Sequence, residues 1–274
     1  MHDSFQLLSQ YAPTLFECAS RSKSDSEIIQ KKYNQRWASM TQGLETNGIF
    51  AAMTCIFDLL WNASENNKYN SAEYLSFIDS TVRRALDATD GVVRKQLEKL
   101  VIRMIVSFGA DNSDYLNHFA EIAVLETLMT KGDFKLECIE KTLPNGKRVD
   151  FEISRDGIRN LIEIYNINFD TEKLHTSDDL KKFLERRLVP KFTAKLNGID
   201  KLGEGFQLIP VLCGDIMSLV KYVEAFEYFK QTTIVAPFMM IASYTNKISG
   251  QVVYDFGSVE NFILRVKKRA EGKL

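Results

Sequence analysis

The sequence lacks the marks of membrane, secreted and disordered proteins. No apolar run in its 274 residues approaches the ~20 residues that span a bilayer. The first residues, MHDSFQLLSQYAP, lack the basic start and the long apolar segment of a signal peptide. Proline and glycine are scarce (5 and 14 residues), whereas 45% of the residues are hydrophobic. We therefore expect an ordered protein of the cytoplasm with no membrane partner.

Signatures of several catalytic and metal-binding classes are missing as well. The four cysteines are widely separated and form no CxxC pair, which argues against a structural zinc site and a disulfide framework. We expect buried thiols at all four positions, which are Cys18, Cys55, Cys138 and Cys213. The three histidines form no HxxxH or HExxH pattern, and no P-loop, GxGxxG or GxSxG sequence occurs.

Positive charge is not in excess either. The chain has 35 Lys and Arg and 36 Asp and Glu, so no net positive field would draw it to DNA or RNA. Nucleic-acid binding would need a local patch, and the best one lies between Lys181 and Lys195, where six basic residues accompany one acid. The residues predicted to contact a phosphate backbone are Lys182, Arg186, Arg187 and Lys191. A solvated helix face is the alternative interpretation of this patch.

The length permits one elaborated domain or two smaller ones. The N-terminal part has helical periodicity, which is clearest over Ser71–Leu86. Turn-forming residues at 22–26, 43–48, 64–70 and 90–91 divide it into about five helices. Because a polar, turn-prone stretch follows at 109–114, we predict a helical region over residues 1–112 and an α/β domain over residues 113–274.

The second region mixes helices and strands. We predict a helix over Tyr115–Thr130 and strands over 134–140, 148–154 and 160–168. A helix capped by Ser177 and kinked or split at Pro190 follows, and then a strand over 206–213. A helix over 216–230, strands over 233–243 and 252–256, and a helix from Val259 complete the predicted order.

Two carboxylates lie in the stretch Lys147–Asn166. Asp150 and Glu163 fall on two predicted strands joined by a turn at Asp156-Gly157. Neighbouring strands hold their side chains at a fixed separation, and hard oxygen ligands suit Mg²⁺ or Mn²⁺. We therefore predict a divalent metal site at these two acids, with Tyr165 on the same strand face as Glu163.

These residues resemble the motif of the PD-(D/E)xK nuclease superfamily, with Val149 at the proline position and Tyr165 at the lysine position. The predicted elements from Tyr115 to Cys213, about a third of the chain, are similar to the αβββαβ core of that family. The resemblance implies an α/β fold with a mixed central sheet of restriction-endonuclease-like type and flanking helices, preceded by the helical region. It also implies the carbonyl of Ile164 as a further metal ligand.

Many members of this family carry a glutamate on the helix before the first strand. An apolar residue, a leucine and a glycine follow it at three, seven and eleven positions. Glu121 reproduces this spacing with Val124, Leu128 and Gly132, so Glu121 is the predicted auxiliary ligand. Glu126 is the competing acid on the same helix.

Tyr165 is the main departure from the family motif. The motif lysine helps to activate the attacking water or stabilises charge on the phosphate. A phenol can form a hydrogen bond with a water or a phosphate oxygen, but it carries no positive charge at pH 7. Some family members carry the lysine on another element, and the candidates here are Lys135, Lys147, Lys181 and Lys182.

The resemblance implies metal-dependent hydrolysis of phosphodiester bonds in DNA, with Mg²⁺ or Mn²⁺ as the cofactor and RNA as the alternative substrate. The implied catalytic residues are Asp150, Glu163, Tyr165 and Glu121. The alternative is a catalytically degenerate nuclease fold that binds nucleic acid or a protein partner. In that case the helical region would recognise the partner or mediate homodimerisation.

Overall fold

The chain forms a helical unit, residues 1–126, and an α/β unit, residues 127–274. The computed structural model describes residues 3–47, 54–65, 70–108, 114–167, 173–199, 205–215, 222–230, 237–245 and 251–270. The division between the units falls inside helix α7 (Asp114–Lys131), whereas the sequence predicts it after residue 112. Most of the polar, turn-prone stretch at 109–114 lies outside the described residues, which resume at Asp114.

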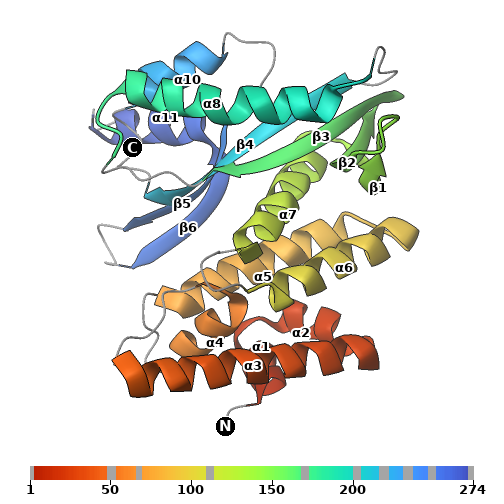
Figure 1. The fold of residues 1–274 in the computed structure, drawn as a ribbon, viewed down its shortest axis with the longest axis vertical. Helices are drawn as coiled ribbons and strands as arrows, with labels where there is room; N and C mark the ends of the chain where they lie inside the picture. Colours follow the sequence, from red (N-terminus) through yellow and green to blue (C-terminus); the bar gives the residue numbers. More distant parts are fainter. Residues whose placement is uncertain are drawn as a thin grey trace. The chain divides into compact units, whose positions relative to one another are not determined.

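Six helices precede α7 in the described part of the helical unit (Figure 1). They are α1 (Ser4–Tyr11), α2 (Pro13–Ser20), α3 (Lys23–Asn47), α4 (Ile56–Ser64), α5 (Ser71–Asp87) and α6 (Gly91–Val106). The predicted breaks at 64–70 and 90–91 are confirmed. The break predicted from residue 43 begins too early, because α3 continues to Asn47.

The break between α1 and α2 is absent from the sequence prediction. Pro13 accounts for it, because its ring fixes φ and it has no N–H to donate within α1. Proline is well suited to the first position of a helix, and Pro13 occupies that position in α2. Ala12, the residue between the two helices, has a non-helical φ of -150°.

Helix α5 has the predicted amphipathic character. Its apolar residues at helical spacing are buried, namely Tyr74, Leu75, Ile78, Val82 and Leu86. Phe119 of α7 packs edge-on against the rings of Tyr74 and Phe77, with centroid distances of 6.5 and 5.4 Å. The first part of α7 therefore contributes to the core of the helical unit.

A six-stranded mixed sheet forms the centre of the α/β unit (Figure 1). Its strands follow one another in sequence order: β1 (Lys135–Thr142), β2 (Arg148–Arg155), β3 (Ile158–Ile167), β4 (Gly205–Asp215), β5 (Met239–Thr245) and β6 (Val252–Ser258). The pairs β3–β4 and β4–β5 are parallel, and the other three pairs are antiparallel. The predicted α/β class with a mixed sheet, flanking helices and a helical N-terminal region is confirmed.

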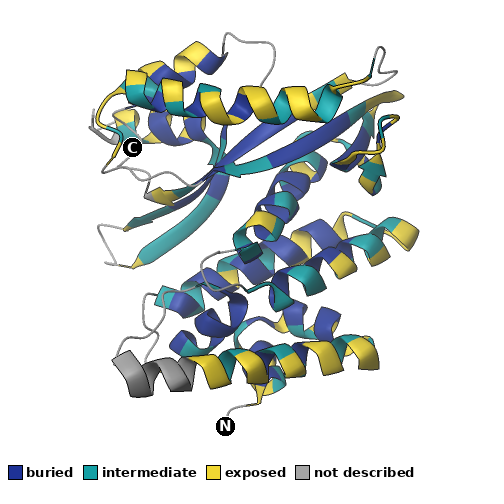
Figure 2. Cartoon of the chain, in the orientation of Figure 1, coloured by how far each residue is buried: buried dark blue, intermediate teal, exposed yellow. Residues whose placement is uncertain are grey.

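Among the residues that the structure describes, three further helices belong to the α/β unit: α8 (Ser177–Leu196), α10 (Val223–Lys230) and α11 (Val259–Ala270). Their apolar residues form one core with those of β3, β4 and β5, so all three helices cover the same face of the sheet. Figure 2 shows buried and exposed residues alternating along α8, as expected for a helix with one face on the core. From α7 to β4 the element order is α, β, β, β, α, β.

The β2–β3 hairpin has the predicted two-residue turn. Asp156 and Gly157 have φ values of 53° and 78°, as required at both central positions of a type I′ turn. Arg155 pairs with Ile158 at the turn, and regular pairing ends at Phe151 and Ile162. Asp150 and Glu163, the next residue on each strand, therefore lie where the two strands stop pairing.

The start of α8 differs from the prediction, and the helix is not split at Pro190. The helix is capped by Thr176, whose side chain accepts a hydrogen bond from the Asp179 amide, and Ser177 is its first residue. Pro190 does not split the helix, which continues to Leu196. Parts of the next predicted elements, residues 216–221 and 233–236, lie outside the described residues. No helix among those the structure describes is both long and apolar enough to cross a membrane.

Candidate functional site

Glu163 is a buried carboxylate on β3 that contacts two lysines of α8. Its side chain is 2% exposed. Lys191 Nζ lies 2.8 Å from Oε1, and Lys195 Nζ lies 2.8 Å from Oε2. Burial of an unpaired carboxylate is unfavourable, and the two ammonium groups supply charged partners for Glu163 inside the fold.

The two lysines continue the core-facing side of α8. Leu180, Leu184 and Leu188 are buried at a spacing of four residues, and Lys191 and Lys195 follow at the next two helical positions. Two like charges four residues apart on a helix repel each other, and one carboxylate between them removes that repulsion. The sequence signal for a buried acid under the helix is a lysine at a position where the apolar stripe should continue. The sequence interpretation did not use this signal.

Lys195 is fixed more firmly than Lys191. Its ammonium group also donates to the carbonyl of Arg148, and its side chain is 19% exposed. The end of α8 around it is held by the β1–β2 turn, since Asn145 Nδ2 donates to the carbonyls of Lys195 and Asn197, both at 2.9 Å. Lys147 donates to the carbonyl of Ala194 in the same way. These donors satisfy carbonyls that a helix end leaves without partners.

Lys191 is less restrained. Its side chain is 34% exposed, and its ammonium group lies 5.3 Å from the centre of the Tyr165 ring. The structure thus brings together Glu163, Tyr165 and a lysine from α8, which supplies the positive charge that Tyr165 lacks. Lys191 is among the residues predicted to bind a phosphate backbone, and the structure places it against Glu163.

One oxygen of Glu163 lacks a hydrogen bond. No donor among the described residues is aligned with Oε2, although Lys195 Nζ lies within ion-pair distance. The ion pair with Lys195 is therefore the one described interaction of this oxygen.

Asp150 lies at the end of the β2–β3 ladder. Its Oδ2 accepts a hydrogen bond from the amide of Ile164 at 2.6 Å. The Asp150 carboxylate thus accepts the amide hydrogen bond of the residue after Glu163, just beyond the last paired residues of β2 and β3. Asp150 and Glu163 are thus brought to neighbouring positions, as the sequence predicts.

The donors present suit a hard divalent cation. Two carboxylates and the carbonyl of Ile164 offer oxygen ligands, which Mg²⁺ and Mn²⁺ prefer, and Mg²⁺ commonly binds through one or two carboxylates and several waters. Within the described ranges, no group of three or more His, Cys, Asp or Glu side chains is arranged to hold a metal ion. A cation here would therefore rest on Asp150, Glu163, backbone and water.

The two glutamates of α7 have different surroundings. Glu126 is buried, and its Oε1 accepts a hydrogen bond from Arg84 Nε at 2.7 Å. Glu121 is only partly buried, with Oε1 lying 3.7 Å from Nδ1 of His118. Glu126 thus has the surroundings of a structural ion pair, and Glu121 stays the predicted auxiliary ligand.

Glu152 is a further buried acid that the sequence interpretation missed. It lies two residues after Asp150 on β2 and is 3% exposed. Lys141 Nζ lies 2.7 Å from its Oε2 and Arg159 Nη1 lies 3.3 Å from its Oε1, so strands on both sides supply a cation. Because both oxygens have partners, Glu152 joins the strands of the sheet and offers no open ligand position.

The remaining predicted basic residues lie on the outer side of α8. Lys182, Arg186 and Arg187 are exposed. Of the lysines considered as substitutes for the motif lysine, Lys181 lies 3.6 Å from the Tyr228 ring centre and Lys135 lies 3.5 Å from Glu137. Neither contact involves Glu163, whereas Lys191 contacts it directly.

Charge is distributed unevenly between the two units. The α/β unit has 23 Lys and Arg and 20 Asp and Glu, whereas the helical unit has 12 and 16. The nearly neutral chain therefore has a net charge of +3 in the α/β unit and -4 in the helical unit. The local positive charge that a phosphate backbone requires lies in the unit that carries Asp150 and Glu163.

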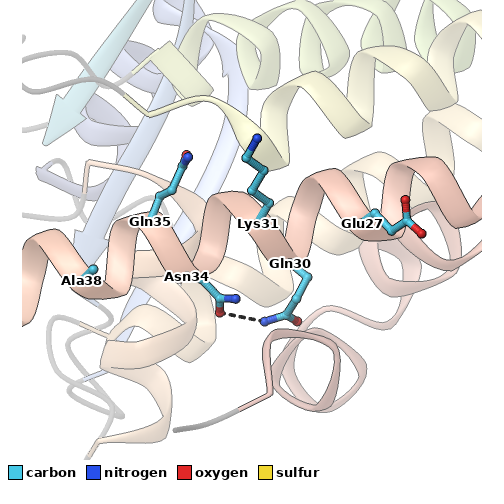
Figure 3. A pocket seen from close by; sticks show the side chains of 6 residues that line it. All are labelled: Glu27, Gln30, Lys31, Asn34, Gln35 and Ala38. Carbon is cyan, nitrogen blue, oxygen red and sulfur yellow. Dashed lines mark hydrogen bonds between the residues drawn. The ribbon is translucent and has the colours of Figure 1, made fainter.

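Two hollows elsewhere have linings of other kinds. One, of about 620 Å³, lies along α3, and all its lining residues belong to that helix (Figure 3). Within it Gln30 Nε2 donates to Asn34 Oδ1 at 2.9 Å. The other, of about 260 Å³, lies beside α10 and α11 and is lined by apolar side chains such as Phe226, Phe238 and Ile263. Neither contains the acid and lysine cluster around Glu163.

Comparisons of the chain with models of known protein families, with curated proteins and with solved structures find no match.

Proposed function

We propose that the protein is a metal-dependent nuclease that hydrolyses phosphodiester bonds in DNA through a PD-(D/E)xK-like site. The carrying observation is the ammonium group of Lys191, 2.8 Å from the buried carboxylate of Glu163 and beside Tyr165. Lys191 of α8 would thus take the role of the motif lysine, whose position on β3 is occupied by Tyr165. The order of elements from α7 to β4 supports the same proposal.

Asp150, Glu163 and the carbonyl of Ile164 would hold Mg²⁺ or Mn²⁺. When bound, the cation would polarise the phosphate and lower the pKa of a water. Lys191 would stabilise negative charge on the phosphate, and the Tyr165 hydroxyl would orient the water or a phosphate oxygen.

DNA would be bound by the exposed side of α8. Lys182, Arg186 and Arg187 present three positive charges there, which suits contacts with a phosphate backbone. RNA is the alternative substrate, since phosphate contacts alone do not separate the two polymers. A homodimer or a protein partner bound by the helical unit belongs to the same proposal.

The test is a cleavage assay on supercoiled, linear and single-stranded DNA and on RNA, with Mg²⁺ or Mn²⁺. Asp150→Asn, Glu163→Gln and Lys191→Met should each lower the cleavage rate by about 100-fold or more, because each removes an interaction worth several kcal/mol in the transition state. Asp156→Asn is the matched control, since Asp156 is exposed at the hairpin turn and asparagine also tolerates a positive φ. Cleavage that persists in the site variants would contradict the proposal.

A noncatalytic binding protein is the second candidate, and a specific observation favours it. Both oxygens of Glu163 lie 2.8 Å from lysines, and Asp150 accepts the Ile164 amide, so the acids have partners without a cation. This candidate predicts that none of the four substrates is cut. It also predicts that Lys182→Ala and Arg186→Ala weaken DNA binding and make it less dependent on salt.

A further inference from the structure

Lys191 and Lys195 carry more positive charge than Glu163 neutralises. Two ammonium groups share one buried carboxylate, each at 2.8 Å from one of its oxygens. Lysine side chains are point charges that bind phosphate oxygens well. The lysine pair is therefore suited to bind a phosphate oxygen beside Glu163.

The lysines and a divalent cation compete for the same atoms. Mg²⁺ binds carboxylate oxygens at roughly 2.0–2.1 Å, and ammonium groups that already contact those oxygens would repel it. A cation can bind Glu163 strongly only when at least one ammonium group moves away. Water can solvate the displaced ammonium group, and a phosphate oxygen would hold it away from Glu163 more strongly than water does.

Lys191 is the group that can move. It is more exposed than Lys195, and its only described hydrogen-bonding or ionic partner is Glu163. Lys195 also donates to the carbonyl of Arg148 and stands where the β1–β2 turn holds the end of α8. Displacement of Lys191 therefore leaves the helix end in place.

We propose that Lys191 and Lys195 form a phosphate-binding site whose occupancy is coupled to the cation site at Glu163. A phosphate group draws Lys191 away from Glu163, and the carboxylate then accepts the cation. Phosphate and cation therefore strengthen each other's binding, and by linkage the effect is equal in both directions. This inference rests on the proposed function. It explains why the cation would bind strongly together with the substrate and weakly without it.

The experiment measures Mn²⁺ affinity from the electron paramagnetic resonance signal of free Mn²⁺, with and without the dinucleotide TpT as a phosphodiester probe. In the full-length protein, TpT should raise Mn²⁺ affinity by about 5- to 150-fold. Lys191→Met should raise the affinity without TpT by a similar factor and remove most of the TpT effect. Lys268→Met, an equal charge change at an exposed position of α11, should behave as the unchanged protein. Thymidine replaces TpT in a control, and samples without protein correct for Mn²⁺ bound by the dinucleotide.

The outcomes separate this inference from the nuclease function. Equal Mn²⁺ affinity with and without TpT would overturn the coupling even if Lys191→Met did not fold, because that comparison uses the unchanged protein. Equal affinities of the unchanged protein and Lys191→Met would overturn it too. Absence of Mn²⁺ binding in both proteins would overturn the coupling and the proposed metal site together. Coupled binding without cleavage of DNA would support the coupling and contradict only the nuclease function.

Discussion

Asp58 and Asp79 of the helical unit and Glu163 of the α/β unit are buried carboxylates with different kinds of partner. In the helical unit, Asp58 accepts two hydrogen bonds from Arg36, both at 2.8 Å, and two from Thr54, at 2.9 and 3.0 Å. Asp79 accepts the amides of Thr14 and Leu15 at the start of α2 and the hydroxyl of Thr14. Each of these acids is fully used in holding helices together.

Glu163 in the α/β unit is equally buried but less well bonded. Its partners are two lysines, one of its oxygens has no aligned donor among the described residues, and a third of the Lys191 side chain is exposed. The difference separates a structural carboxylate from a candidate functional one. Structural acids are bound by rigid donors on every side, whereas Glu163 is held by a flexible side chain that can exchange for another ligand.

The largest expected effect is on the structural pair. Asp58→Ala leaves the guanidinium of Arg36, 12% exposed, without its partner, and should lower the free energy of unfolding of the helical unit by about 3–5 kcal/mol. The hydrogen bond with Asp58 is the main cause that raises the pKa of Arg36, so the variant loses the interaction that most favours the charged guanidinium. Urea unfolding followed by circular dichroism measures the change. Asp87→Ala, at an exposed position of α5, is the control and should change stability by less than about 0.5 kcal/mol.

Glu163→Gln should be less damaging to stability. Lys191 can turn toward solvent once the carboxylate is gone, so the loss should be about 1–3 kcal/mol, in the range of one hydrogen bond to a charged group. The same urea unfolding experiment on the full chain gives the value. If Glu163→Gln were as destabilising as Asp58→Ala, Glu163 would be a structural acid and the distinction between the two units would fail.

The contrast also shows what a sequence can disclose. The Asp156-Gly157 dipeptide predicts its own turn, because few residues other than glycine, asparagine and aspartate tolerate the positive φ that the turn requires. The turn and the alternation of side chains between the two faces of β3 both follow from neighbouring residues. Together they place Asp150 beside Glu163, and they place Glu163 and Tyr165 on the face toward α8.

Partners far apart in the chain could not be predicted in this way. The pairing of Lys191 with Glu163 depends on how α8 is rotated over the sheet, which is set by packing and not by the residues between them. The hydrogen bond from the Ile164 amide to Asp150 depends on where strand pairing stops. Pro13 is a local signal for a helix break, but the sequence interpretation did not predict a break there.

The start of α8 gives a smaller effect with a pH dependence. Thr176→Ala removes the side chain that caps the helix and should destabilise the α/β unit by about 0.5–2 kcal/mol. The hydrogen bond with the Thr176 side chain is the main cause that lowers the pKa of Asp179 below 3.8. Because the pKa of Asp179 is lower in the folded state, its ionised carboxylate stabilises the fold at pH values above the pKa of the unfolded state. This stabilisation is lost as the pH falls through the pKa of the folded state. The difference between Thr176→Ala and the unchanged protein should therefore be constant near pH 7 and narrow below about pH 4, as measured by urea unfolding at several pH values. A difference that widens in acid would contradict this assignment.

The smallest expected effect concerns the thiols. Cys18 and Cys55 are buried as predicted, and burial raises the pKa of each to about 12. Cys138 and Cys213 are only partly buried; burial raises the pKa of Cys213 to about 12 and also raises that of Cys138, which lies on the edge strand β1. Because the thiolate is the reactive form, a thiol reagent at pH 8 should modify Cys138 first in the folded protein and the other three only as it unfolds. Mass spectrometry of peptides after timed labelling identifies the order, with Cys138→Ser as the control. Early labelling of Cys18 or Cys55 would show that the helical unit opens more readily than its fully bonded carboxylates imply.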